Sequence, residues 1–136
     1  MDQRLPKRLE ALLHAFRAQN QGDLKRIGND AIADAATNND EDLAGVSVIA
    51  YSLYKMLTKE HFTASPRWPK VADGITGALQ KCLDAIGSND TGNFAKGMKN
   101  VIGKIEGIDY ELSNYARNIY EKAKIKQAST AYALGL

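Results

Sequence analysis

Side chains that could perform catalytic or metal chemistry are few in this sequence. It contains two histidines, His14 and His61, and a single cysteine, Cys82. A metal site needs several converging donors, and no His-x-x-x-His, Glu-x-x-His or Cys-x-x-Cys spacing occurs. Neither a Gly-x-Ser-x-Gly motif nor a glycine-rich phosphate loop is present. We therefore predict no catalytic residue, no metal site and no cofactor.

Two spacings could nevertheless support chemistry. Asp30 and Asp34 are four positions apart and could share a cation, although a solvated helix face with mild repulsion is the simpler expectation. The Arg8–His14 spacing resembles the Arg-x(4–6)-His pattern of helical ribonucleases of the HEPN type, in which His is the acid or base and Arg stabilises the phosphate. Leu9 replaces the polar residue common after that Arg, and six residues turn a helix by about 600°, which separates the two faces. A ribonuclease stays an alternative, and we predict that the chain is not an enzyme.

Basic residues are concentrated near the end of the sequence. Arg117, Lys122, Lys124 and Lys126 are followed by short polar side chains, a combination that suits phosphate contacts. These cations would be spread around a helix with Glu121 among them, so a solvated helix end stabilised by its dipole is the alternative. The tract is a candidate contact with a partner or with nucleic acid.

Aromatic residues are candidates for a partner interface, because tyrosine buries its ring and keeps its hydroxyl near water. Tyr51 and Tyr54 are three positions apart, and Trp68 lies in a segment with two prolines. Packing at the margin of the core would also explain the tyrosines, and Trp68 would be either a lid over the core or an exposed anchor. The candidate interface residues are Trp68, Tyr51, Tyr54, Tyr115 and Tyr120.

The elements that must position these residues are helices, because apolar residues recur at helical spacing and no long alternation indicates a strand. Six helices are predicted, with breaks at Gly22-Asp23, Asn38–Asp40, Thr63–Pro69, Gly87–Asp90 and Gly107. Gly22-Asp23 and the Asn38/Glu41 pair are expected to supply N-caps. The third helix is predicted to run to about Glu60. The fourth begins at either Ser65-Pro66 or Pro69, an alternative that the sequence leaves open.

The predicted fold class is all-α, a compact bundle of about six antiparallel helices built from αα-hairpins at residues 3–38, 40–86 and 90–132. The Gly-Asp break and the Ala-rich second helix resemble a tetratricopeptide unit, but the fixed period of about 34 residues is absent. Gly97 and the Gly103/Gly107 pair predict either close helix crossings around residues 97–107 or a mobile fifth helix.

Composition indicates one soluble domain over residues 1–136. The chain is 44% hydrophobic and 25% charged, and its net charge of +2 does not by itself indicate nucleic acid. One cysteine excludes an intramolecular disulfide. No run approaches the about 18 apolar residues of a membrane span, and the N-terminus lacks the order of a signal peptide. We expect a cytoplasmic protein without a membrane partner.

Residues 116–129, followed by residues 131–136, are similar to a stretch in uncharacterised small archaeal proteins, where a helical bundle precedes a C-terminal helix-turn-helix. Residues 50–55 and 66–68 are similar to them too, so the resemblance covers residues 40–136. The chain ends where that motif would begin. The resemblance therefore implies a DNA-binding regulator whose DNA-reading part lies outside this sequence.

These observations predict a non-catalytic interaction or dimerisation module of a regulatory protein. Its partner would be a second copy of the chain or another protein, with nucleic acid as a candidate for the basic tract. The alternatives are a stand-alone protein-binding scaffold of the tetratricopeptide type and a HEPN-like helical ribonuclease.

Overall fold

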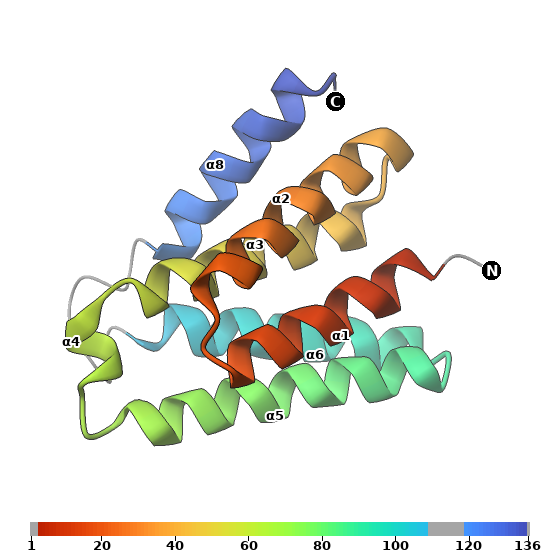
Figure 1. Cartoon of the computed structure of the whole chain (residues 1–136). Coiled ribbons are helices and arrows are strands. Elements are labelled where there is room, and N and C mark those ends of the chain that lie inside the picture. Colours follow the sequence, from red (N-terminus) through yellow and green to blue (C-terminus); the bar gives the residue numbers. More distant parts are fainter. Residues whose placement is uncertain (1–2, 109–118, 136) are drawn as a thin grey trace.

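The computed structural model describes residues 3–108 and 119–135, and these residues form helices and turns without a strand (Figure 1). The helices are α1 (Arg4–Arg17), α2 (Gln21–Asn38), α3 (Glu41–Leu57), α4 (Glu60–Thr63), α5 (Trp68–Gly87), α6 (Thr91–Glu106) and α8 (Ile119–Ala133). The predicted all-α bundle is confirmed. The part of the predicted sixth helix between residues 109 and 118 lies outside the described residues.

The helices pack as two antiparallel pairs with α1 between them. α2 lies along α3, α5 lies along α6, and α1 contacts α2, α3 and α5. α8 packs against α3 and α2, at the end of the molecule opposite α5 (Figure 1).

The predicted grouping into three hairpins is wrong for residues 40–86, because α3 and α5 are not a packed pair. Short turns at Asn39-Asp40 and Ser88–Asp90 force α2 onto α3 and α5 onto α6. The longer connection through α4 lets α5 pack away from α3, against α1 and α6.

One main hydrophobic core runs between the two helix pairs. Its largest fully buried side chains are Phe62, Leu9, Leu12, Leu24, Ile27, Ile49, Leu53, Met56, Ile75, Leu79 and Ile105. Except for Phe62, these residues lie on the apolar stripes that helical spacing predicts. Each stripe faces inward because a helix buries one side and leaves the other in water. The fully buried Leu43 belongs to a second, smaller cluster with Ile32, Ala35 and Ala131.

The helix N-caps differ by a few residues from those predicted. Asn20, not Gly22-Asp23, caps α2, and its side chain accepts a hydrogen bond from the Asp23 amide at 3.0 Å. Asp40, not Asn38, caps α3, and its carboxylate accepts from the amides of Asp42 and Leu43. In both turns the true cap is the polar residue that directly precedes the first helical residue, and its side chain reaches the free amides of the first turn.

The segment between α3 and α5 fixes the position of Trp68. The third helix ends at Leu57 rather than near Glu60, and Phe62 on α4 enters the core. Trp68 is the first residue of α5, with Pro69 in the first turn, where a proline removes no helical hydrogen bond. Its indole is 4% exposed and meets the Phe16 ring edge-on at 6.2 Å between centroids. Of the two predicted roles, Trp68 is the lid over the core, and its prediction as an interface residue is wrong.

Glycines allow one close helix crossing in the predicted region. At Gly97 of α6, an added Cβ would lie 2.7 Å from Cys82 Sγ on α5 and 3.6 Å from Cys82 Cα. The prediction is wrong for the Gly103/Gly107 pair. Gly103 has open space beside it, and Gly107 contacts only the preceding turn of its own helix, at the end of α6.

α8 is attached to the α2–α3 pair through a buried polar side chain. Gln127 is 1% exposed, and its Nε2 donates to the carbonyl oxygens of Gly28 on α2 at 3.2 Å and Ser47 on α3 at 3.4 Å. An added Cβ at Gly28 would lie 3.4 Å from the Ser47 oxygen, so the glycine gives the three helices room to meet. This junction fixes the rotation of α8 about its axis. Of the helices in the described ranges, none is both long enough and apolar enough to cross a membrane.

Candidate nucleic-acid interface

Two tyrosines on α3 form the centre of a basic surface. The rings of Tyr51 and Tyr54 are tilted against each other with centroids 5.6 Å apart, and both residues are half-buried. Lys55 Nζ lies 5.9 Å from each ring centroid. Lys25 of α2 reaches Tyr54 at 5.7 Å, and Lys126 of α8 reaches Tyr51 at 5.4 Å. We call these five residues the Tyr–Lys surface.

The local sequence explains why these side chains meet. Residues three and four apart share a helix face, so Tyr51, Tyr54 and Lys55 project together from α3. Lys126 precedes the buried Gln127, whose hydrogen bonds hold α8 against α2 and α3. Ammonium groups are attracted to the negative faces of aromatic rings. This attraction offsets the repulsion among Lys25, Lys55 and Lys126, which all lie near the two tyrosine rings.

A cavity of about 370 Å³ adjoins the Tyr–Lys surface between α3, the start of α4 and the first turns of α8. Its lining residues are Tyr51, Lys55, Lys59, His61, Ile119, Lys122 and Ala123. It shares Tyr51 and Lys55 with the Tyr–Lys surface and adds Lys59 and Lys122. Three lysines therefore line the cavity, and none of its described lining residues carries a carboxylate.

The lysines of the surface and the cavity have no acidic partners in the described part of the chain. Within residues 3–108 and 119–135, no ion pair involves Lys25, Lys55, Lys59, Lys122 or Lys126. Positive charges that have no carboxylate beside them attract an anion from solution more strongly than paired ones. This arrangement suits the binding of a polyanion.

Two arginines near α2, by contrast, are paired with carboxylates. Arg8 lies between α1 and α2, with NH2 3.0 Å from Asp34 and NH1 3.6 Å from Asp30. Arg26 pairs with Asp23 at 3.3 Å and with Asp30 at 3.7 Å. The expectation that Asp30 and Asp34 form a merely solvated face is wrong, because both carboxylates bind the guanidinium of Arg8.

Arg8 and His14, the two residues of the ribonuclease alternative, lie on different sides of α1. Arg8 faces α2 through its ion pairs, whereas His14 is exposed and lines a groove between α1 and α5. The side chains thus diverge, as six residues on a helix require.

The predicted basic tract divides around α8. Lys126 belongs to the Tyr–Lys surface and Lys122 lines the adjoining cavity, whereas Lys124 lies 3.7 Å from Glu121 and 5.7 Å from the centroid of the Tyr120 ring. Arg117 lies outside the described residues.

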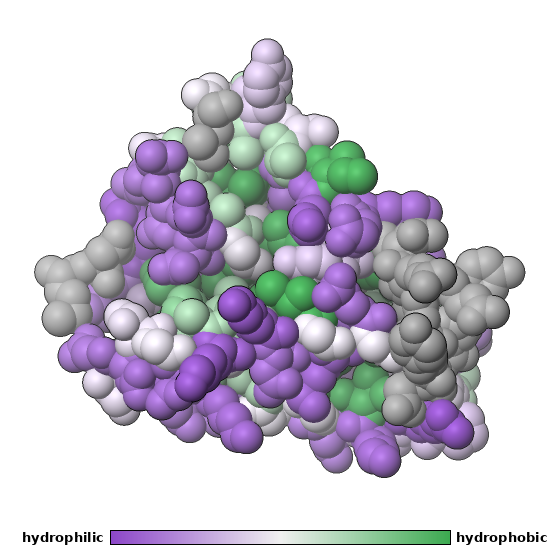
Figure 2. All heavy atoms as spheres, turned by 180° about the vertical axis from the view of Figure 1, so that it is seen from behind, coloured by the Kyte–Doolittle hydropathy of each residue, from purple (hydrophilic) through white to green (hydrophobic). Residues whose placement is uncertain are grey.

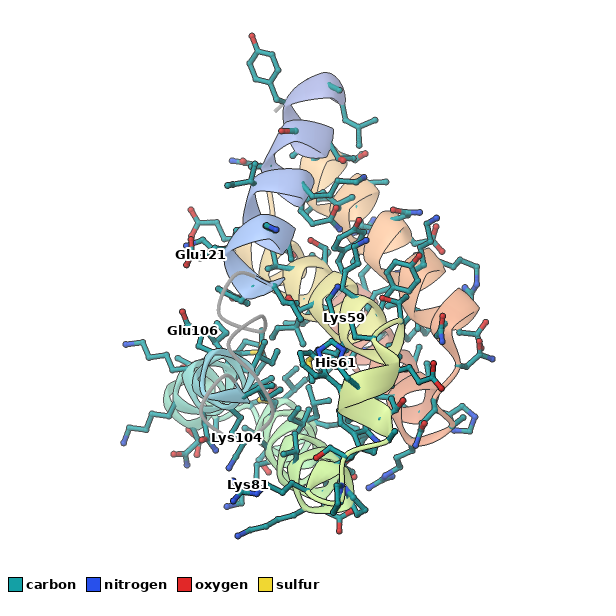
Figure 3. The ribbon with its side chains drawn as sticks, turned by 90° about the vertical axis from the view of Figure 1, so that its left-hand side faces the viewer. Lys59, His61, Lys81, Lys104, Glu106 and Glu121 are labelled. Atoms are coloured by element: carbon teal, nitrogen blue, oxygen red, sulfur yellow. The ribbon has the colours of Figure 1, made fainter. Side chains whose placement is uncertain are left out.

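The predicted aromatic interface divides as well. Tyr51 and Tyr54 belong to the surface, and Tyr115 falls outside the described residues. Tyr120 is 9% exposed, and burial raises the pKa of its hydroxyl, with a further contribution from the carboxylates of Glu106 and Glu121. Figure 3 shows these two acidic residues on one side of the molecule, away from Lys59 and His61 on the α3–α4 side.

Sequence reasoning missed Lys25, Lys55 and Lys59 as site residues. Helical spacing could have joined Lys55 to Tyr51, since the two are four residues apart. Lys25 becomes a neighbour of Tyr54 only through the packing of α2 on α3. Lys59 follows α3 directly and lines the same cavity as Tyr51.

The described residues contain no group of three or more His, Cys, Asp or Glu side chains that could hold a metal ion. Cys82 is fully buried, and this burial raises the pKa of its thiol to about 11. The thiol is therefore protonated and shielded near neutral pH.

Comparison with known proteins gave no match to any family model, curated protein or solved structure.

Proposed function

We propose that the chain is a non-catalytic interaction module that binds nucleic acid through the Tyr–Lys surface and the adjoining cavity. The observation that supports it is that Lys25, Lys55 and Lys126 lie near the rings of two tyrosines, and that two further lysines line the adjoining cavity. None of these five lysines has a carboxylate partner among the described residues. Lysines supply the phosphate contacts that dominate nucleic-acid affinity, and tyrosine rings supply surfaces for bases. This role is consistent with the predicted module of a regulatory protein.

The two alternative functions have less support. A protein-binding scaffold of the tetratricopeptide type would present a concave row of stacked hairpins, whereas here α1 packs against both helix pairs, α2–α3 and α5–α6. A ribonuclease acting through Arg8 and His14 would need both groups at one phosphate, whereas Arg8 is held by two carboxylates on another face.

We expect Lys55→Gln and Lys126→Gln each to weaken the binding of a short fluorescein-labelled DNA strand of mixed sequence by about three- to tenfold. Each lost phosphate contact should also lower the slope of log K against log salt by about 0.7–0.9. Fluorescence anisotropy titrations at several salt concentrations measure both quantities.

The control is Lys96→Gln, which removes the same charge from the exposed start of α6, beside the α5–α6 turn. It should leave affinity and slope nearly unchanged. Absence of binding by the native chain, or equal losses in all three variants, would contradict the proposed function.

A second candidate function, self-association, is favoured by the outer face of α8. Among the described residues, the exposed large hydrophobic side chains are Ile125 and Tyr132 on α8, with 66% and 81% of their surfaces accessible, and Leu134 directly after the helix, with 54%. Hydrophobic residues on both the inner and outer faces are typical of a helix that is covered on both sides. Figure 2 shows hydrophobic residues at the upper end of the rear face, among further hydrophobic residues at its centre and lower right.

A second copy of the chain fits this face because the stripe is self-complementary. Ile125 and Tyr132 share one side of α8 and are placed symmetrically about the small residues Ala128 and Ser129. Two α8 helices crossing antiparallel at that point would set Ile125 of one copy against Tyr132 of the other, which is the arrangement that a two-fold axis requires.

We expect light scattering coupled to gel filtration to give twice the chain mass for the native protein and the single-chain mass for Ile125→Lys. The control is Ala95→Lys, which adds the same charge on the exposed side of α6 and should leave the protein dimeric. A monomeric native chain at high concentration would remove this candidate.

A further inference from the structure

We infer that the nucleic acid bound at the Tyr–Lys surface is single-stranded, with an unpaired base stacked on the tyrosine pair and a neighbouring phosphate in the cavity. This inference rests on the proposed function and names the form of its ligand. It follows from how the rings, the lysines and the cavity are placed relative to one another.

The tyrosine rings lie below the positive charges. Tyr51 and Tyr54 are half-buried, and the ammonium groups of Lys25, Lys55 and Lys126 lie 5.4–5.9 Å from the ring centroids. A duplex presents its phosphates outward and keeps its bases stacked inside, so it could contact these lysines but not the rings. An unpaired base can turn away from its backbone and reach them.

The lysines over the rings would exchange partners when a base arrives. A stack between a base and a tyrosine is stronger than an exposed contact between lysine and tyrosine, so the base displaces the ammonium group. Lys55, which is near both rings, and Lys126 then pair with the flanking phosphates. The same lysines therefore lie near the tyrosine rings when the site is empty and contact the phosphates when a strand is bound.

The cavity gives the next phosphate a defined position. It begins at Tyr51, so a phosphate one step along the strand from the stacked base enters between Lys55, Lys59 and Lys122. Ile119 and Ala123 form an apolar wall that suits the sugar. Its volume of about 370 Å³ lies within the usual range for small-ligand sites, roughly 300–1,000 Å³.

The test compares a fluorescein-labelled single-stranded DNA with the same strand annealed to its complement, by anisotropy at one salt concentration. We expect the single strand to bind at least about tenfold more tightly than the duplex. Tyr54→Leu keeps an apolar side chain but removes the ring, and should weaken single-strand binding about five- to thirtyfold while changing duplex binding less than about twofold.

Tyr54→Phe is the matched variant, because it keeps the ring and removes only the hydroxyl, and it should retain single-strand affinity. Thermal melts of both variants show whether they fold. Equal affinity for single strand and duplex, or an equal loss in Tyr54→Phe and Tyr54→Leu, would overturn the inference and leave the proposed function standing. Failure of the native chain to bind either form would overturn both.

Discussion

Replacing Trp68 with alanine is expected to lower the free energy of unfolding by about 3–5 kcal/mol, the usual range for truncating a buried aromatic residue. The indole is 4% exposed and packs edge-on against Phe16, so alanine would leave a cavity at the contact between α1 and α5. Urea unfolding followed by circular dichroism measures the change. Circular dichroism reports on the helices, so it still works in a variant that lacks the chain's single Trp and its fluorescence.

Trp68→Phe is the control, because it keeps an aromatic ring facing Phe16. The Trp68 Nε1 atom is buried without a hydrogen-bond partner among the described residues, so losing it removes no hydrogen bond. We expect the phenylalanine variant to lose about 1–1.5 kcal/mol. An alanine variant as stable as the native chain would mean that Trp68 is an anchor on the surface rather than a lid.

Trp68 illustrates how far the fold can be predicted from sequence. Two prolines around it indicate a break between helices, and this break exists between α4 and α5. Proline chemistry allows Pro69 in a first helical turn as well as in a loop, so the start of α5 stays open at the level of sequence. Whether Trp68 faces the core or the solvent is decided only in the folded chain, where it packs against the buried Phe16.

Helix stripes are predictable because each depends on residues a few positions apart. The stripe of α3, including Leu43, Val46, Ala50 and Leu53, is buried as expected. The pairing of helices is not predictable in the same way, since it depends on turn lengths and on which faces are left after the first contacts form. That is why the predicted hairpin over residues 40–86 is wrong although two long helices do form there, α3 and α5, with the short α4 between them.

The sequence predicts the candidate site only as two separate halves. Tyr51 and Tyr54 stand out as aromatic residues on one helix, and Lys122 and Lys126 as basic residues on another, without any expectation that they meet. Packing of α8 on α3 brings Lys126 to 5.4 Å from the Tyr51 ring. No spacing rule connects residues so far apart in the chain.

Net charge conceals the basic surface. The chain carries 18 basic and 16 acidic residues, a balance that does not suggest nucleic acid. The structure separates these charges, because Arg8 and Arg26 take up Asp23, Asp30 and Asp34 between themselves. The five lysines of the Tyr–Lys surface and its cavity, by contrast, have no ion pair within the described residues.

Replacing Gly97 with valine is expected to lower the free energy of unfolding by about 3 kcal/mol, at the upper end of the cost of overpacking. Its Cβ would lie 2.7 Å from Cys82 Sγ, and the two further methyl groups would enter the crossing of α5 and α6. Cys82 is fully buried, so its sulfur has little free space in which to move aside. Urea unfolding measures the loss.

Gly97→Ala separates the two opposing contributions. Alanine in place of glycine favours a helix by about 1 kcal/mol, whereas the overlap with Sγ costs more, so we expect a net loss of about 1 kcal/mol. In a Cys82→Ala background the sulfur is absent and the sign should reverse, making Gly97→Ala stabilising by up to about 1 kcal/mol. The Cys82→Ala background should rescue Gly97→Val only in part, because the Cys82 backbone atoms, 3.6–3.7 Å from the added Cβ, remain in place. Equal effects of Gly97→Ala in both backgrounds would show that the sulfur does not set the distance between these helices.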